Sequence, residues 1–298
     1  MSMRDANPAR DSVKRRLIAE FGWTRSSYWL ISAFAATLFL LGTVWWPLAE
    51  EYLAMIDWSR PLWIQLDWLL IGVFLAMSLL IMAGADVKED LWILVVGLGG
   101  GLVIESWGTQ TELWTYYTLE RPPLWIIPAW PIASLSIDRL VRILNTLVRP
   151  LRPKVFPILY WLILPSFYML MLHFVWPTLD KPTTWVALLL SALLIATTTD
   201  SRMAVLTFAA GTGLGYFLER WGTTRLCWTY YTGQAPPLFA VLAHGMAALA
   251  FWRTVWLLND LRSRASGSGA PLARNLGQIR VLVRVYVDLR SLFTRMRG

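Results

Sequence analysis

Long apolar runs alternate with short polar connections along most of this chain. A transmembrane helix needs roughly 20 mainly apolar residues, and eight runs reach or approach that length. We therefore expect an all-α integral membrane protein with about eight transmembrane helices. The runs lie at about 28–48, 62–85, 91–107, 124–144, 156–176, 183–199, 202–219 and 237–258.

The composition of the chain also favours a lipid environment. The 298 residues are 56% hydrophobic and 15% charged, whereas soluble domains carry about 25% charged residues. Many of the 19 Trp, 10 Tyr and 12 Phe residues stand at the ends of apolar runs, where aromatic rings favour the membrane interface. These features exclude a soluble function.

The net charge of +8 is concentrated between the apolar runs and at the ends of the chain. Lys and Arg gather in the first 25 residues, in 149–154 and after residue 260, and the positive-inside rule assigns such segments to the cytoplasm. This distribution favours anionic lipid, and not nucleic acid, as the partner. We expect a multi-pass protein of a bacterial-type inner (cytoplasmic) membrane, with both termini in the cytoplasm and no cleaved signal peptide.

The sequence repeats itself at an offset of 114 residues. The segment ESWGTQTELWTYYT at 105–118 matches ERWGTTRLCWTYYT at 219–232 in nine of fourteen positions. Because each copy holds four expected spans, an even number, the two copies should share one orientation and be related by a pseudo-twofold axis along the membrane normal. We expect two tandem four-helix repeats in parallel orientation, with a shared cavity between them.

The repeat also sets the expected domains. A cytoplasmic basic leader covers 1–27, the first repeat covers 28–148, and the second covers 149–260. The remaining segment, 261–298, combines a flexible linker with a basic tail. We expect that tail to form a C-terminal amphipathic helix that binds anionic lipid head groups, although a frayed basic tail explains the same composition.

Glu105 and Glu219, at equivalent positions of the repeat, are the candidate catalytic residues. Each is expected to end a helix where apolar sequence gives way to W-G-T. A carboxyl group near the bilayer is costly and usually has a partner or a function. Kept from water, it can hold a proton and act as a general acid. Alternatively, each glutamate is exposed at the interface or paired with Arg121, Arg220 or Arg225.

The segment after each glutamate alternates aromatic residues with threonine. This period of two places the Trp and the first Tyr of W-T-Y-Y-T on one side of the chain. They are expected to form either a lid over an apolar cavity or an aromatic belt at the outer interface. The candidate ligand-binding residues are Trp107, Trp114, Tyr116, Trp221, Trp228 and Tyr230.

The same motif predicts local backbone structure. Gly108 and Gly222 are expected to adopt the angles that end a helix. Thr109 and Thr223 are expected to hydrogen-bond to nearby backbone. The fourth span of each repeat is expected to start at the paired prolines that follow, Pro122-Pro123 and Pro236-Pro237.

Small residues recur at alternate positions in the third span of each repeat. They favour close packing of a neighbouring helix, and the alternative is that they leave room for a ligand. These residues are Gly97, Gly99, Gly101, Gly211, Gly213 and Gly215.

The polar residues outside the repeated motif are weaker candidates for a functional site. His173 and His244 have no histidine partner at ligand spacing, and each is expected to be packed or hydrogen-bonded; the repeat counterpart of His244 is a tryptophan. Asp67 is a lone acid in the second span, and Asp138 can pair with the arginine that follows it. The single cysteine, Cys227, excludes an intrachain disulfide. Neither a metal site nor a cofactor is expected.

The pattern E-x-W-G-T-x-x-x-x-W-T-Y-Y-T, followed by P-P-L-W-I-I-P-A-W-P at 122–131, resembles the signature loops of membrane carotenoid-biosynthesis proteins. The likeness is nearest to the integral-membrane carotenoid hydratases related to the bisanhydrobacterioruberin hydratase, and more distant to the small-subunit lycopene cyclases. It implies an enzyme that protonates a C=C bond of a long isoprenoid, with Glu105 and Glu219 as acids. Aromatic rings of the motif would then stabilise a carbocation.

Three functions remain open at this level. The first is an isoprenoid-modifying membrane enzyme of the hydratase or cyclase type, with a buried glutamate in an apolar cavity. The second is a non-catalytic subunit or scaffold that binds partner membrane proteins, a pigment or a lipid, with its glutamates paired at the surface. The third is a transporter or lipid-handling protein, which requires a polar path across the bilayer.

Overall fold

The computed structural model describes residues 21–44 and 46–265 of the chain. Most of the expected basic leader and the whole of the expected amphipathic tail helix lie outside the described residues. The chain divides into two units at Trp252, and residues from Arg253 onward form the second unit. The candidate site belongs to the first unit.

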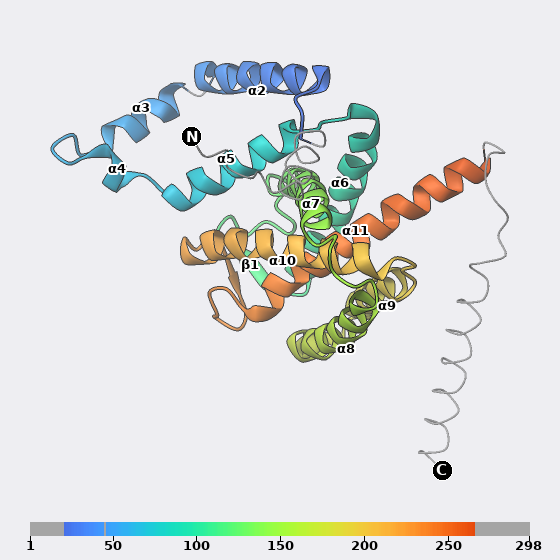
Figure 1. Ribbon diagram of the computed structural model, residues 1–298. Coiled ribbons are helices and arrows are strands. Elements are labelled where there is room, and N and C mark those ends of the chain that lie inside the picture. Colours follow the sequence, from blue (N-terminus) through green and yellow to red (C-terminus); the bar gives the residue numbers. More distant parts are fainter. Residues whose placement is uncertain (1–20, 45, 266–298) are drawn as a thin grey trace, which may run out of the picture. The chain divides into compact units, whose positions relative to one another are not determined.

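The described residues are mainly helical, with one short two-stranded ribbon (Figure 1). In chain order the elements are α2 (Arg25–Val44), α3 (Trp46–Ala54), α4 (Leu62–Gln65), α5 (Trp68–Met82), α6 (Val87–Gln110), β1 (Trp114–Tyr116), α7 (Ala129–Leu147), α8 (Val155–Val175), η1 (Trp176–Thr178), α9 (Pro182–Ala196), α10 (Ser201–Thr224), β2 (Trp228–Tyr230) and α11 (Leu238–Ala265).

Among the described residues, three helical segments are long and apolar enough to cross a membrane: Val87–Gln110, Val155–Thr178 and Leu238–Ser263. At 1.5 Å per residue, the 24 residues of the first segment reach about 36 Å, more than the roughly 30 Å of the hydrocarbon core. Two shorter apolar helices, Trp68–Met82 and Pro182–Ala196, accompany them. These helices indicate a membrane protein.

The predicted start of the fourth apolar run is wrong in the first repeat. Helix α7 begins at Ala129, and the residues between Pro123 and Ala129 form turns. A helix through this segment would need a backbone N–H at Pro128, which proline lacks, and its ring would clash with the carbonyl of Leu124. The equivalent position in the second copy is Leu242, and there the helix begins directly after the paired prolines.

Helix α7 packs against α5, α6 and α10, and thereby holds the elements of the site together (Figure 1). A Cβ at Gly97 of α6 would lie 2.7 Å from the Cα of Pro131 in α7, so only glycine permits this approach. Gly211 meets Gly245 in the same way, at 2.9 Å. The packing interpretation is confirmed at these two positions, whereas a Cβ at Gly99 or Gly213 would meet nothing within 4 Å.

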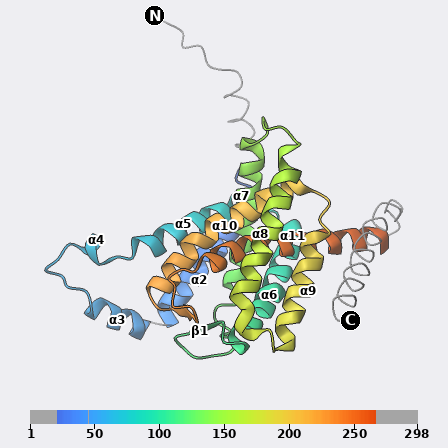
Figure 2. The ribbon, with the colours of Figure 1, turned by 90° about the horizontal axis from the view of Figure 1, so that it is seen from below.

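Helices α8 and α9 lie side by side (Figure 2). The Tyr168 hydroxyl donates to Ser191 Oγ at 3.1 Å, and the Tyr160 hydroxyl donates to the Ile195 carbonyl. Their outer faces carry many exposed apolar side chains, for example Ile158 and Leu189, which are 63% and 68% exposed. Exposed apolar surface of this extent fits contact with lipid.

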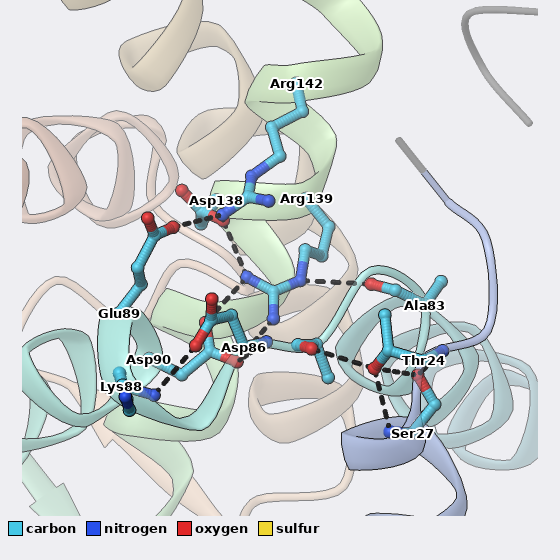
Figure 3. Close-up of polar contacts among 11 residues, drawn as sticks. Thr24, Ser27, Ala83, Asp86, Lys88, Glu89, Asp90, Asp138, Arg139 and Arg142 are labelled. Atoms are coloured by element: carbon cyan, nitrogen blue, oxygen red, sulfur yellow. Dashed lines mark hydrogen bonds and ion pairs between the residues drawn. The ribbon is translucent and has the colours of Figure 1, made fainter. Parts of the chain in front are cut away.

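A buried ion cluster joins α6, α7 and the end of α5 (Figure 3). The Arg139 side chain is 0% exposed. It donates to both carboxylate oxygens of Asp90, at 2.9 and 2.7 Å, to Asp138 at 2.7 Å and to the Ala83 carbonyl at 3.2 Å. The expected pairing with Asp138 is confirmed, and Asp90 is the further partner that the sequence did not single out. A buried arginine is tolerated because its donors are used in this way.

Candidate functional site

The two candidate glutamates are buried inside their helices. Glu105 lies in α6 and Glu219 in α10, and they are 4% and 3% exposed. The prediction that each glutamate ends its helix is wrong, since α6 continues to Gln110 and α10 to Thr224. Each carboxyl group therefore projects from regular helix, which fixes its direction.

The role predicted for the motif glycines is also wrong, because both lie within helix. A Cβ at Gly108 would lie 1.9 Å from Cη2 of Trp114, and a Cβ at Gly222 would lie 1.9 Å from Cη2 of Trp228. Each glycine thus admits an indole ring against the helix surface. In this way the ring reaches the glutamate one turn earlier.

The threonines of the motif do hydrogen-bond to local backbone, as predicted. Thr109 Oγ1 donates to the carbonyl of Glu105, and Thr223 Oγ1 donates to the carbonyl of Glu219, each at 2.6 Å. These bonds close the helical turn that carries each glutamate.

Three side chains donate hydrogen bonds to the carboxyl group of Glu105. Oε2 accepts from Trp114 Nε1 at 3.0 Å and from the Tyr116 hydroxyl at 2.9 Å, and Oε1 accepts from Trp130 Nε1 at 3.0 Å. Trp114 and Tyr116 alternate along β1, so the predicted period of two brings both to one side. All three donors are neutral.

The carboxyl group of Glu219 has the equivalent partners, with one exchange. Oε2 accepts from Trp228 Nε1 at 3.0 Å, and Oε1 accepts from the Tyr230 hydroxyl at 2.8 Å. At the position equivalent to Trp130 stands His244, whose Nε2 lies 2.9 Å from Oε1. His244 is hydrogen-bonded, as predicted, but its partner is the candidate catalytic acid.

The alternative in which arginines pair with the glutamates is not what the described residues show. Arg121 pairs with Glu112 at 2.8 Å, and Arg225 pairs with Asp67 at 2.7 Å. Among the described residues, neither glutamate has a lysine or arginine within ion-pair distance.

Asp67 lies just before α5, as the N-cap residue of that helix. It accepts hydrogen bonds from Arg225, from Trp221 Nε1 at 2.9 Å and from the backbone N–H of Leu70. The hydrogen bond from Arg225 is the main reason why the pKa of Asp67 lies below its ordinary value. Asp67 therefore anchors the end of α10 beside the glutamate motif.

The two aromatic segments pair with each other. Strands β1 and β2 are antiparallel, with Trp114 opposite Tyr230 and Tyr116 opposite Trp228. The central pair is Thr115 and Thr229, whose hydroxyl oxygens are 3.1 Å apart. Residues 115 and 229 are separated by the 114-residue offset of the sequence repeat, so the ribbon is centred on equivalent positions.

Each contact around this ribbon has a counterpart in which the residues of the first and second sequence repeats exchange places. The Tyr117 N–H donates to the Cys227 carbonyl, and the Tyr231 N–H donates to the Leu113 carbonyl, both at 3.1 Å. The ring centroids of Trp114 and Tyr230 are 5.9 Å apart, and so are those of the exchanged pair, Tyr116 and Trp228. Equivalent sequence thus makes equivalent contacts across the ribbon.

Trp130 and His244 meet between the two glutamates. Their rings stack with centroids 5.6 Å apart and an angle of 17° between planes. Gly101 and Gly215 make this arrangement possible, since a Cβ at either would lie 2.4 Å from Trp130 Cγ or from His244 Cβ respectively. Sequence reasoning did not place either ring in the site, although their equivalence in the repeat was the available signal.

A cavity of about 200 Å³ connects the two halves of this arrangement. Both glutamates line it, and most of the remaining lining is aromatic or aliphatic. Of the six aromatic residues predicted to bind a ligand, five line the cavity: Trp114, Tyr116, Trp221, Trp228 and Tyr230. Trp107 is not among the lining residues; its Nε1 donates to Thr184 at 3.3 Å.

Comparisons with protein-family models, with curated proteins and with solved structures found no match to this chain. Within the described residues, no group of three or more His, Cys, Asp or Glu side chains is arranged to hold a metal ion. The chemistry that these residues can perform is proton transfer in an aromatic, apolar cavity.

Proposed function

We propose that this chain is a membrane enzyme that protonates a C=C bond of a long isoprenoid, in the manner of a hydratase or cyclase. The observation that carries the proposal is the pair of buried glutamates, each held by a Trp and a Tyr and each facing one apolar cavity. Such a carboxyl group can deliver a proton to an alkene that has no polar group of its own.

The size and lining of the cavity support an isoprenoid end group as the substrate. A cavity of about 150 Å³ lined by apolar side chains binds benzene, and this one measures about 200 Å³. It therefore accommodates one or two isoprene units, and the remainder of a long chain would lie in the membrane. The resemblance of the motif to carotenoid hydratases and lycopene cyclases favours the same substrate class.

The two glutamates have different roles in this proposal, because their third partners differ. Glu219 contacts His244, which can exchange a proton with it; Glu105 contacts Trp130, which only donates a hydrogen bond. In the proposed reaction, the protonated form of Glu219 transfers its proton to the CH carbon of the terminal double bond, which forms a C–H bond and leaves a tertiary carbocation on the dimethyl-substituted carbon. Glu105 and the aromatic rings stabilise that cation.

The cation is then consumed in one of two ways. In a hydratase, water forms a C–O bond with the cation, and the proton it loses returns through His244 to Glu219. In a cyclase, a second double bond of the same chain attacks the cation, and loss of a proton from carbon restores neutrality. Both routes return Glu219 to its protonated form, so neither needs a cofactor.

The proposal includes a membrane arrangement. Eight spans form two tandem four-helix repeats, related by a pseudo-twofold axis along the membrane normal, with both termini in the cytoplasm of a bacterial-type cell. Equivalent contacts across the ribbon support this axis. The ribbon of β1 and β2 then covers the cavity on the outer side.

Deuterium incorporation tests the reaction. The purified protein is incubated in D₂O with lycopene, squalene or a polyprenol, and products are analysed by mass spectrometry after back-exchange in water. A hydratase adds the elements of one water, with one of its two hydrogens retained as carbon-bound deuterium, whereas a cyclase gives an isomer with one deuterium in place of one hydrogen. We expect Glu219→Gln to reduce the product roughly 100-fold or more, and the exposed-site control Glu112→Gln to leave it unchanged.

The outcome against the proposal is equally specific. Absence of carbon-bound deuterium from all three isoprenoids, with a folded protein, would contradict an alkene-protonating enzyme. A co-purified stoichiometric protein subunit would then favour the scaffold.

A further inference from the structure

The charge balance of the cavity is unusual. Glu105 and Glu219 are 4% and 3% exposed, and both line the cavity. Buried carboxylates normally have a cationic partner, because removing an ionised group from water is costly. Here the described residues that line the cavity include no lysine or arginine, and His244 is the only basic side chain among them.

The indole and phenol groups that donate hydrogen bonds to these glutamates carry no full positive charge. Glu105 accepts from two indole N–H groups and one phenol. Three donors aimed at one carboxyl group form the set that an ionised carboxylate accepts best. Among the described residues, no lysine or arginine pairs with Glu105, so a bound cation would supply the partner that an ionised Glu105 needs.

Aromatic faces add to this electrostatic preference. Trp130 and Phe251 line the cavity together with the ribbon aromatics, and the rings of these two residues are in edge contact with centroids 5.9 Å apart. The face of an aromatic ring attracts a cation through its quadrupole, most strongly when water is excluded. Glu105 and the aromatic lining therefore act in the same direction.

From this geometry we infer that the cavity binds an apolar molecule that carries a compact positive charge. A protonated amine on a hydrocarbon chain is a stable molecule of this kind. The inference deepens the proposed function and rests on it for one point. This point is that the bound cation occupies the place of the carbocation that forms in the proposed reaction. The apolar lining selects the hydrocarbon, and Glu105 with the aromatic rings selects the charge.

A matched pair of probes tests this preference. One is a dimethylamine with a saturated, branched ten-carbon chain, which is protonated at neutral pH; the other is the methyl ether of the same chain. Each is titrated calorimetrically into the full-length protein in an uncharged maltoside detergent, and the heat of titration into empty micelles is subtracted. Because neither probe contains a C=C bond, neither can be turned over.

We expect the wild-type protein to bind the amine roughly tenfold or more tightly than the ether. Glu105→Gln should remove most of this preference and leave the affinity for the ether unchanged. Glu112→Gln is the control, because Glu112 is 61% exposed and pairs with Arg121 outside the cavity.

Equal affinities of the wild-type protein for the amine and the ether would overturn the inference. So would an undiminished preference for the amine in Glu105→Gln. If this variant fails to fold, the wild-type comparison of the two probes decides alone. A protein that incorporates deuterium but shows no preference for the amine loses this inference and keeps the proposed function; the reverse result keeps the cation site and removes the reaction.

Discussion

At the scale of single residues, the site is a duplicated constellation with one substitution. Glutamate, tryptophan and tyrosine occupy equivalent positions in both copies and make equivalent hydrogen bonds. Only the third partner differs, Trp130 in one copy and His244 in the other. Because imidazole exchanges protons near neutral pH and indole does not, this one difference is the basis for the different roles that we propose for the two glutamates.

Exchanging the two rings tests this division. His244→Trp should reduce deuterium incorporation roughly 100-fold or more, because Glu219 loses the group that reprotonates it. Trp130→His alone should keep most of the activity. The double exchange moves the histidine to Glu105 and should recover a large part of what His244→Trp loses.

The decisive comparison is between the double exchange and His244→Trp. Equal activity in both would mean that a histidine at Glu105 cannot replace one at Glu219, and the equivalence of the two half-sites would be refuted. Circular dichroism in detergent checks that each variant is folded.

At the scale of elements, close approach between a helix and a ring builds each half-site. A Cβ at Gly108 would lie 1.9 Å from Cη2 of Trp114, so the indole occupies the space that a larger side chain would need. The helix continues past the glutamate, and the chain then turns back so that β1 returns along it. Without this glycine, the tryptophan cannot reach the carboxyl group one turn away.

Gly108→Ala should therefore destabilise the protein by about 1–3 kcal/mol and weaken ligand binding, since the indole must shift. Gly99→Ala is the matched control in the same helix, because a Cβ there would meet nothing within 4 Å. It should be neutral or stabilising by up to about 1 kcal/mol. Thermal unfolding in detergent compares the two, and equal midpoints would contradict the packing role of Gly108.

The sequence predicted many residues of the candidate site, but not the third partner of each glutamate. Glu105, Glu219 and the alternating Trp and Tyr were identifiable because the motif occurs twice and its period of two orders the side chains. Trp130 was not, since it stands 25 residues from Glu105 and differs in type from its counterpart. Tertiary packing through Gly101 and Gly215, which local sequence does not encode, brings these rings to the glutamates.

Helix boundaries were the weaker part of the sequence prediction. The glycine pattern predicts an end to each motif helix, yet the helix continues, because the absence of a Cβ makes room for the indole ring and is not needed for a backbone turn. The paired prolines Pro122 and Pro123 predict the start of α7, yet Pro128 delays it to Ala129. The first error arose from tertiary packing against an indole ring, and the second from a further proline within the expected helix.

At the scale of the whole molecule, the proposed parallel repeats make a prediction about topology. Cys227 is first replaced by serine, and single cysteines are introduced as Glu120→Cys, Gln234→Cys and Arg152→Cys at exposed positions. A membrane-impermeant maleimide applied from outside should label positions 120 and 234 but not 152. Labelling of 120 and 234 from opposite sides would instead mean inverted repeats, and would contradict the shared outer ribbon.

The central claim is that the glutamate-lined cavity receives an isoprenoid. The most direct measurement is mass spectrometry, with an absorption spectrum, of the apolar molecules that co-purify with the intact protein in mild detergent. The comparison is with a cavity-filling variant, Ala248→Phe, at a small residue that lines the cavity. We expect a bound isoprenoid or polyene in the wild-type protein and its loss from the filled variant. Equal amounts in both, or partner subunits without any apolar ligand, would contradict it.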